Sequence, residues 1–170
     1  MSLARVTCAF LLLFAAPVCA QVVQPAGPRP PNLKALPMAV HGRVLREGSD
    51  FVRQWPGTYF ETAFRGSSAF FRVGPGEVSL RIRVDGRPPI ALVKPSPGLY
   101  RVGGLAAGAH RLRIDVASES QAGVTVFGGY YAPAGVTSLP TPKRRKSIEF
   151  IGDSHTVGYG NTSPSRQCTE

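Results

Sequence analysis

The sequence predicts a mostly β protein, in which an antiparallel jelly-roll β-sandwich precedes the first strand of an incomplete α/β domain. Three observations favour this class. Apolar and polar residues alternate with a period of two along several segments, turns rich in glycine and proline separate those segments, and no segment shows the period of a long helix. The hydrophobic content of 43% is normal for a globular protein and does not suggest disorder.

The clearest predicted strands are residues 78–84 and 110–116, where every second residue is apolar. Such alternation places one set of side chains in a core and the other in water. Asp85-Gly86 supplies the positive φ values that a tight hairpin turn needs. About eight short strands over roughly 100 residues are typical of a sandwich, which we assign to residues 39–138. The other predicted strands are 40–46, 58–65, 68–73, 89–94, 98–103 and 124–131.

Residues 1–20 are interpreted as a secretory signal peptide, with Arg5 before an apolar run and small residues ahead of Gln21. The apolar run is too short to span a bilayer. A lipoprotein signal stays open as an alternative because Cys19 lies near its end, but we favour plain export to a secreted or periplasmic location. Residues 21–38 contain five prolines and are expected to form an extended spacer and not a core element.

Loss of the signal peptide leaves Cys168 as the single cysteine, either paired with a partner elsewhere or free. The net charge of +10 falls to +9, because Arg5 is the only charged residue removed. Export argues against nucleic acid as the partner of this charge. We interpret it as a solvated surface, with acidic polysaccharide or the cell envelope left open. The protein is expected to be a monomer without stable membrane insertion.

Residues 139–147 are interpreted as a polar linker, and residues 148–170 as the incomplete start of a second domain. Ile148, Phe150 and Ile151 predict a short buried strand that ends at Gly152-Asp153-Ser154. A serine just past a strand exposes its hydroxyl on a turn, where its own amide can face a developing oxyanion. The hydroxyl still needs a base to accept its proton.

The segment Phe150-Ile151-Gly152-Asp153-Ser154, with Gly158-Tyr159-Gly160-Asn161, resembles the first block of the SGNH (GDSL-type) hydrolases. It is most similar to the acetylxylan esterases of carbohydrate esterase family 2. Trp55-Pro56-Gly57-Thr58-Tyr59-Phe60-Glu61 is similar to a recurrent strand of that family's N-terminal jelly-roll domain, which precedes the SGNH domain.

The resemblance implies a secreted serine esterase that removes O-acetyl groups from xylan, related polysaccharides or their sugars, without a cofactor. It implies Ser154 as the nucleophile, with its amide donating to the oxyanion, and Asp153 as a support of the turn. The family's catalytic histidine, together with an oxyanion glycine and asparagine, lies in later blocks that this chain does not match. The chain is therefore expected to be an inactive N-terminal fragment.

The three histidines are not predicted to supply the base. His155 adjoins Ser154, from which its side chain is expected to diverge; His110 is expected to be a hydrogen-bonded core residue; His41 carries no motif. No histidines and carboxylates have metal-ligand spacing, so we predict no metal.

Two further groups of side chains have alternative interpretations. Five aromatic residues could form a sugar-stacking platform or fill the core, and we favour the core; they are Trp55, Tyr59, Phe60, Tyr130 and Tyr131. Arginines 81, 83, 111 and 113 are predicted to form a basic stripe on one sheet face, solvated in preference to binding a polyanion. The alternative function is a non-catalytic, carbohydrate- or envelope-binding sandwich module.

Overall fold

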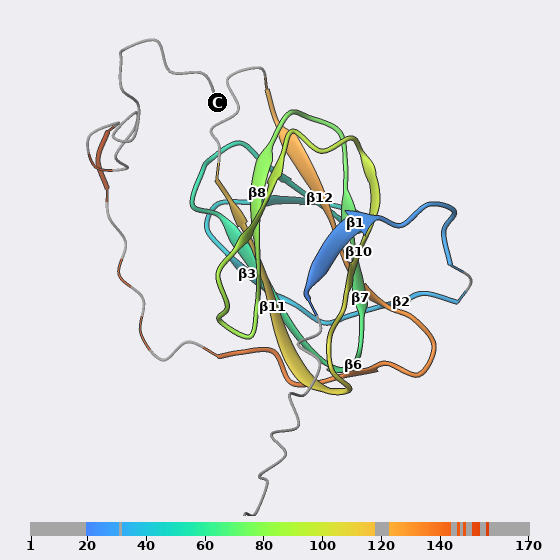
Figure 1. The fold of residues 1–170 in the computed structure, drawn as a ribbon. Helices are drawn as coiled ribbons and strands as arrows, with labels where there is room; N and C mark the ends of the chain where they lie inside the picture. Colours follow the sequence, from blue (N-terminus) through green and yellow to red (C-terminus); the bar gives the residue numbers. More distant parts are fainter. Residues whose placement is uncertain are drawn as a thin grey trace, which may run out of the picture.

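The structure is a computed structural model that describes residues 20–30, 32–117, 123–143, 146, 148, 151–153 and 156. Within these residues the chain forms thirteen β-strands and no helix, so none of the described segments is a helix that could cross a membrane. The strands make two antiparallel sheets that pack face to face (Figure 1). This confirms the predicted antiparallel β-sandwich.

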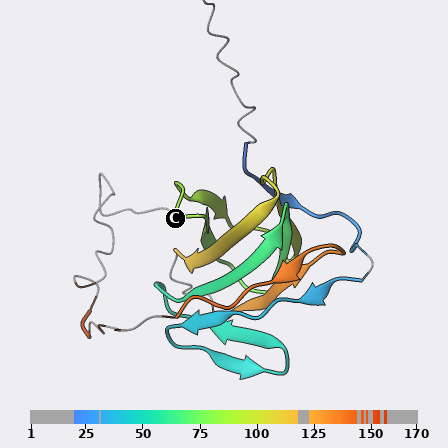
Figure 2. The ribbon, with the colours of Figure 1, turned by 90° about the horizontal axis from the view of Figure 1, so that it is seen from below.

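The first sheet has seven strands, and its edge at β4 and β5 extends as a two-stranded ribbon, drawn in turquoise in Figure 2. Its strands lie in the order β1 (Val22–Pro25), β10 (Gly98–Gly103), β7 (Ala69–Val73), β12 (Thr125–Ala132), β5 (Asp50–Arg53) and β4 (Leu45–Glu47), with β2 (Lys34–Ala35) also paired to β12.

The second sheet has six strands, with β6 and β11 at its centre. Its order is β13 (Thr137–Ser138), β6 (Tyr59–Gly66), β11 (Gly108–Val116), β8 (Ser79–Val84) and β9 (Ile90–Val93), with β3 (Ala39–His41) also paired to β6.

The chain crosses between the sheets after most strands, and only β4–β5 and β8–β9 pair as consecutive hairpins. Crossing connections of this kind are what a jelly-roll arrangement uses. In the β8–β9 turn Asp85 and Gly86 have φ angles of 54° and 71°, and the amide of Arg87 donates to the carbonyl of Val84 at 3.0 Å. The predicted Asp-Gly hairpin is therefore confirmed, because both central residues adopt the left-handed conformation that such a turn needs.

The core lies between the sheets and follows the predicted alternation. Leu80, Ile82, Leu112 and Ile114, from β8 and β11, are all at most 1% exposed. From the other sheet Phe127 stacks on Phe60 of β6 with ring centroids 4.2 Å apart. Because the two sheets interlock through large side chains of this kind, the hydrophobic effect is the main force that holds the sandwich together.

The expectation that residues 21–38 form only a spacer is wrong. The segment contributes β1 and β2 to the first sheet, and Leu36 is 6% exposed within the core. Pro25 ends β1 at the edge of the sheet, where the missing amide of proline interrupts no central ladder. Proline content alone therefore did not exclude pairing.

The segment 40–46, predicted as one strand, forms parts of β3 and β4, which lie in different sheets. Gly42 separates them with a φ of 98°, and a Cβ there would lie 2.8 Å from Oγ1 of Thr58. The chain can turn from one sheet to the other here because glycine tolerates both the positive φ and the close approach.

Candidate functional site

The predicted nucleophile Ser154 and its neighbour His155 lie outside the described residues, so their roles stay predictions. The described flanking residues form a turn, in which the amide of Thr156 donates to the carbonyl of Asp153 at 3.1 Å. A Cβ on Gly152 would collide with Oγ1 of Thr156. A larger residue at 152 would therefore require the side chain of Thr156 to move.

The predicted strand before this turn is not formed by its described residues. Ile148 and Ile151 lie outside all thirteen strands and are 81% and 91% exposed, while Phe150 is not described. A buried strand needs neighbours that satisfy its backbone groups and cover its side chains. None of the described strands of the sandwich pairs with this segment.

His110 is a hydrogen-bonded core residue, as predicted. Its side chain is 9% exposed. Nδ1 lies 2.7 Å from a carboxylate oxygen of Asp85 and Nε2 lies 2.8 Å from the carbonyl oxygen of Ala106. Asp85 also accepts from the amide of Arg111 at 2.9 Å. His110 thus joins the β8–β9 turn to β11, and both of its ring nitrogens are engaged in that structural role.

His41 belongs to a layered polar cluster on the outer face of the second sheet, a position that its sequence did not indicate. Its ring stacks on Tyr59 at 4.3 Å, and its Nε2 lies 3.5 Å from the carboxylate of Glu61, which is only 7% exposed. The guanidinium of Arg113 lies 3.7 Å from the centroid of the same tyrosine ring. Strands β3 and β11 flank β6, so the imidazole of His41 and the guanidinium of Arg113 reach Tyr59 from neighbouring strands.

The predicted basic stripe exists, but a carboxylate interrupts it. Arg113 and Arg83 face each other across β11 and β8, a like-charge pairing that is unfavourable alone. Asp115 relieves it, because it accepts from Nε of Arg113 at 2.7 Å and lies 3.4 Å from Nε of Arg83. Burial opposes the charge of Arg113, yet the hydrogen bond to Asp115 holds its pKa above the usual value. This face is therefore a mixed-charge network.

The five candidate aromatic residues do not form one platform. Phe60 and Tyr130 are buried at 0% and 1% exposure, which confirms their assignment to the core. Trp55 is 60% exposed, so the core assignment is wrong for this residue. It lies in the connection between β5 and β6, outside both sheets. Tyr59 lies in the polar cluster of the outer face, and Tyr131 is half-buried beside a cavity.

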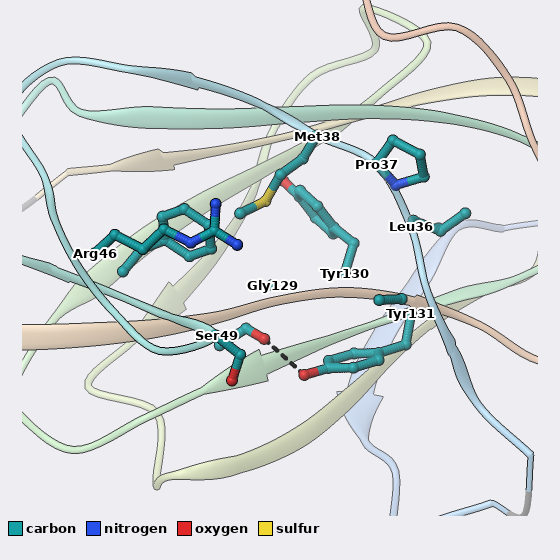
Figure 3. A pocket seen from close by; sticks show the side chains of 11 residues that line it. Leu36, Pro37, Met38, Arg46, Ser49, Gly129, Tyr130 and Tyr131 are labelled. Carbon is teal, nitrogen blue, oxygen red and sulfur yellow. Dashed lines mark hydrogen bonds between the residues drawn. The ribbon is translucent and has the colours of Figure 1, made fainter.

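That cavity has a volume of about 290 Å³ and lies where the β2–β3 connection and the β4–β5 hairpin approach β12 (Figure 3). The sequence did not predict this cavity. Its one local signal is the pair Gly128-Gly129 inside a predicted strand, since glycine in a strand often marks a bulge. Among the described residues, no group of three or more His, Cys, Asp or Glu side chains is placed to hold a metal ion.

The fold and the sequence together define the class: a β-sandwich domain placed ahead of a Gly-Asp-Ser segment. The chain belongs to the carbohydrate esterase 2 N-terminal family, whose model matches residues 40–142.

Two curated relatives agree with this assignment. The chain is 43% identical over 144 residues to an acetylxylan esterase / glucomannan deacetylase of Cellvibrio japonicus (strain Ueda107), covering 82% of this chain and 40% of that protein. It is 36% identical over 117 residues to the cellulase/esterase CelE of Acetivibrio thermocellus (strain ATCC 27405), covering 66% of this chain and 14% of that protein. The chain thus spans less than half of either relative.

Solved structures show the same fold. A carbohydrate esterase whose active site displays divergent catalytic and non-catalytic binding functions superposes with a TM-score of 0.69 at 39% identity, covering 81% of this chain and 41% of that chain. A family two carbohydrate esterase from Clostridium thermocellum in complex with cellohexaose gives a TM-score of 0.63 at 31% identity, covering 74% of this chain and 40% of that chain.

Proposed function

We propose that the protein containing this chain is a secreted carbohydrate esterase that removes O-acetyl groups from xylan or related polysaccharides. The observation that carries the proposal is the order of the two parts. A domain of the carbohydrate esterase 2 N-terminal family, residues 40–142, is followed after a short intervening segment by Gly152-Asp153-Ser154. The 43% identical relative, an acetylxylan esterase / glucomannan deacetylase, supports the substrate class.

The chemistry assigned to Ser154 is acyl transfer. Its hydroxyl oxygen attacks the acetyl carbonyl while a base takes the proton, and the amide of Ser154 donates to the oxyanion that forms. Collapse of this intermediate returns the proton to the departing sugar oxygen and leaves an acetyl-serine. Water then cleaves the acetyl-serine by the same steps, so one ester and one water yield acetate and a sugar hydroxyl.

The base for this reaction is not assigned to the sandwich. His110 uses both ring nitrogens to join β11 to the β8–β9 turn, and His41 stacks on Tyr59 of the outer face. The side chain of His155 is expected to diverge from Ser154, so we propose that the base lies beyond this chain and that the 170 residues alone are inactive. Export is proposed from residues 1–20, with cleavage ahead of Gln21.

The test uses the protein expressed from the complete reading frame that contains this chain. It should release acetate from acetylated xylan or glucomannan, and Ser154→Ala should lower kcat by a factor on the order of 10⁴ or more. Asp153→Ala, a neighbouring change with a supporting role, should cost less than Ser154→Ala. Acetate release that persists in the Ser154→Ala protein would refute the assigned nucleophile.

Two further measurements test the proposed inactivity of the 170-residue chain and the proposed export. The 170-residue chain should not hydrolyse an aryl acetate, and turnover that disappears with Ser154→Ala would overturn its assignment as an inactive fragment. N-terminal sequencing of the exported protein should begin at Gln21.

The second candidate function is a carbohydrate-binding module without catalysis. It is favoured by the fact that the sandwich forms both of its sheets within the described residues, and by the related esterase solved with cellohexaose. Calorimetric titration of residues 21–143 with xylan and cello-oligosaccharides tests it. The fragment begins at 21 because β1 and β2 belong to the sheet, and absence of heat at millimolar ligand would reject this function.

A further inference from the structure

We propose that the cavity beside β12 is a binding site for an acidic sugar, a pyranose unit that carries a carboxylate, separate from the Ser154 segment. The proposal rests on the proposed function only in taking a polysaccharide as the source of the ligand. The proposal is based on the backbone irregularity that opens the cavity, on the side chains that line it and on two arginines that lie over its aromatic rings.

The cavity arises from two irregularities of β12. On one edge β12 pairs with β5 through Thr125–Phe127 and with β2 through Tyr131 and Ala132, so residues 128–130 face no described strand between them. On the other edge the register with β7 shifts by one residue between Phe127 and Tyr130, which is a β-bulge. Bulges re-aim side chains and are frequent beside functional sites.

The two glycines of the bulge have different structural roles. A Cβ on Gly128 would collide with the guanidinium of Arg72, which lies across it. Gly129 has a φ of 88° and a Cβ there would have no atom within 4 Å, so it borders open space. The glycine pair therefore both bends the strand and leaves room next to it.

The lining combines an apolar floor with a polar rim. Leu36, Met38, Phe51 and Tyr130 contribute the floor, while Arg46 and Ser49 of the β4–β5 hairpin lie on the side opposite Leu36 and Pro37 (Figure 3). The volume of about 290 Å³ is close to the lower end of small-molecule pockets, roughly 300 Å³. The cavity is thus suited to one small ring and not to a bulky ligand.

Hydrogen bonds hold the walls in place. The amide of Leu36 donates to the carbonyl of Tyr130 at 2.9 Å, and Oγ1 of Thr62 donates to the carbonyl of Pro37 at 2.7 Å. The hydroxyl of Tyr131 donates to the carbonyl of Gly128 at 2.7 Å. A pocket whose walls are already ordered costs little conformational entropy when a ligand enters.

A sugar ring matches this combination of surfaces. The C–H faces of a pyranose are apolar and can pack on Phe51 and Tyr131, while its hydroxyl groups can meet Ser49 and Arg46 at the rim.

The charge distribution favours a sugar that carries a carboxylate. Arg46 lies over the ring of Phe51 at 5.7 Å, and Arg29 lies over the ring of Tyr131 at 5.8 Å. Nε of Arg46 donates to the carbonyl of Gly48 at 3.2 Å, and no ion pair joins either arginine to an acidic side chain in the described part of the chain. A guanidinium offers paired N–H donors that fit a carboxylate.

The experiment measures binding and not catalysis. The 170-residue chain carrying Ser154→Ala is titrated with a xylo-oligosaccharide that bears a glucuronic acid unit and, separately, with the neutral oligosaccharide of equal length. The acidic ligand should bind about fivefold or more tightly, and about 0.5 M NaCl should reduce that difference because exposed charges are screened. Amide NMR shifts should concentrate at Gly128 and Gly129.

A matched pair of variants locates the binding. Arg46→Met keeps the length of an exposed side chain and removes its charge, so affinity for the acidic ligand should fall about tenfold, the loss of one charge-assisted hydrogen bond. Arg87→Met removes another exposed arginine, from the β8–β9 turn of the other sheet, and should leave affinity unchanged.

Three results would overturn the proposal: no binding of either ligand at millimolar concentration, equal affinity for the acidic and neutral ligands, or equal effects of Arg46→Met and Arg87→Met. The outcome is independent of the esterase assay. If acetate release depends on Ser154 but Arg46→Met has no effect on binding, the sugar site alone fails. If sugar binding behaves as expected and no acetate is released, the proposed esterase function alone fails.

Discussion

Replacing Leu36 by alanine tests whether the proline-rich segment 21–38 is part of the folded domain. Leu36 is 6% exposed and contacts the core from the connection between β2 and β3. The substitution removes three carbon atoms, which at about 0.8 kcal/mol for each buried methylene corresponds to ~2.4 kcal/mol of lost transfer free energy. Buried Leu→Ala changes cost about 2–5 kcal/mol once the residual cavity is included.

We expect a loss near the lower end of that range, about 2–3 kcal/mol, because Leu36 lines an existing cavity whose walls can relax. Leu45→Ala is the matched control. It removes the same atoms from a side chain of β4 that is 62% exposed, and it should change the free energy of unfolding by no more than about 0.5 kcal/mol.

Urea unfolding of the 170-residue chain, followed by far-ultraviolet circular dichroism, gives both values. Circular dichroism is preferred to fluorescence because the single tryptophan, Trp55, is already 60% exposed in the folded state. At roughly 3–5 °C for each kcal/mol, Leu36→Ala should also lower the melting temperature by about 10 °C. If Leu36→Ala and Leu45→Ala destabilise equally, the segment is a spacer after all and the packing described for it is refuted.

Three further substitutions test the β12 bulge and the buried polar groups. Gly128→Ala should displace the guanidinium of Arg72 from its ion pair with Asp50 and cost about 0.5–1 kcal/mol, whereas Gly108→Ala, where a Cβ meets open space, should cost less. Arg53→Met should leave stability unchanged or raise it by up to about 2 kcal/mol, because this guanidinium is 3% exposed, has no hydrogen-bond partner among the described residues, and has its pKa lowered to about 10 by burial. Tyr130→Phe should lower stability at neutral pH by about 1 kcal/mol but flatten its decline above pH ~10, since burial raises the pKa of the Tyr130 hydroxyl well above its usual value.

Denaturation of each variant checks these expectations. An unchanged cost of Gly128→Ala in an Arg72→Ala background would show that the arginine is not what the new methyl group meets. A loss above about 1 kcal/mol for Arg53→Met would show that its contacts with Phe60 and Phe127, at 5.4 Å and 6.0 Å, outweigh its desolvation. For Tyr130 the unfolded state releases its proton first as pH rises, so a steeper decline in the Tyr130→Phe protein would contradict the assignment.

Local sequence patterns were sufficient to predict the structure where one physical requirement dominated. The alternation in 78–84 and 110–116 predicted β8 and β11 with the correct buried faces, because a half-buried strand has no other way to arrange its side chains. Asp85-Gly86 predicted its turn, because few residue pairs accept two positive φ angles. The placement of His110 in the core followed from the same alternation.

Local sequence patterns did not predict the structure where it depends on contacts with segments distant in the chain. The prolines of 21–38 suggested a spacer, but the free edges of β10 and β12 accept β1 and β2. The exposure of Trp55 depends on which sheet covers its loop, and the placement of His41 beside Tyr59 depends on the pairing of β3 with β6. None of these relations is contained in a short window of sequence.

The sequence by itself determined the antiparallel β class, the inward and outward faces of its regular strands and the Gly-Asp-Ser segment on which the proposed chemistry depends, because each follows from the properties of neighbouring residues. Only the tertiary structure decided that residues 21–38 belong to the sheet, that Asp115 divides the basic stripe and that a cavity opens beside β12. These features arise from the register between strands far apart in the chain, and register is set by the packing of the whole sandwich.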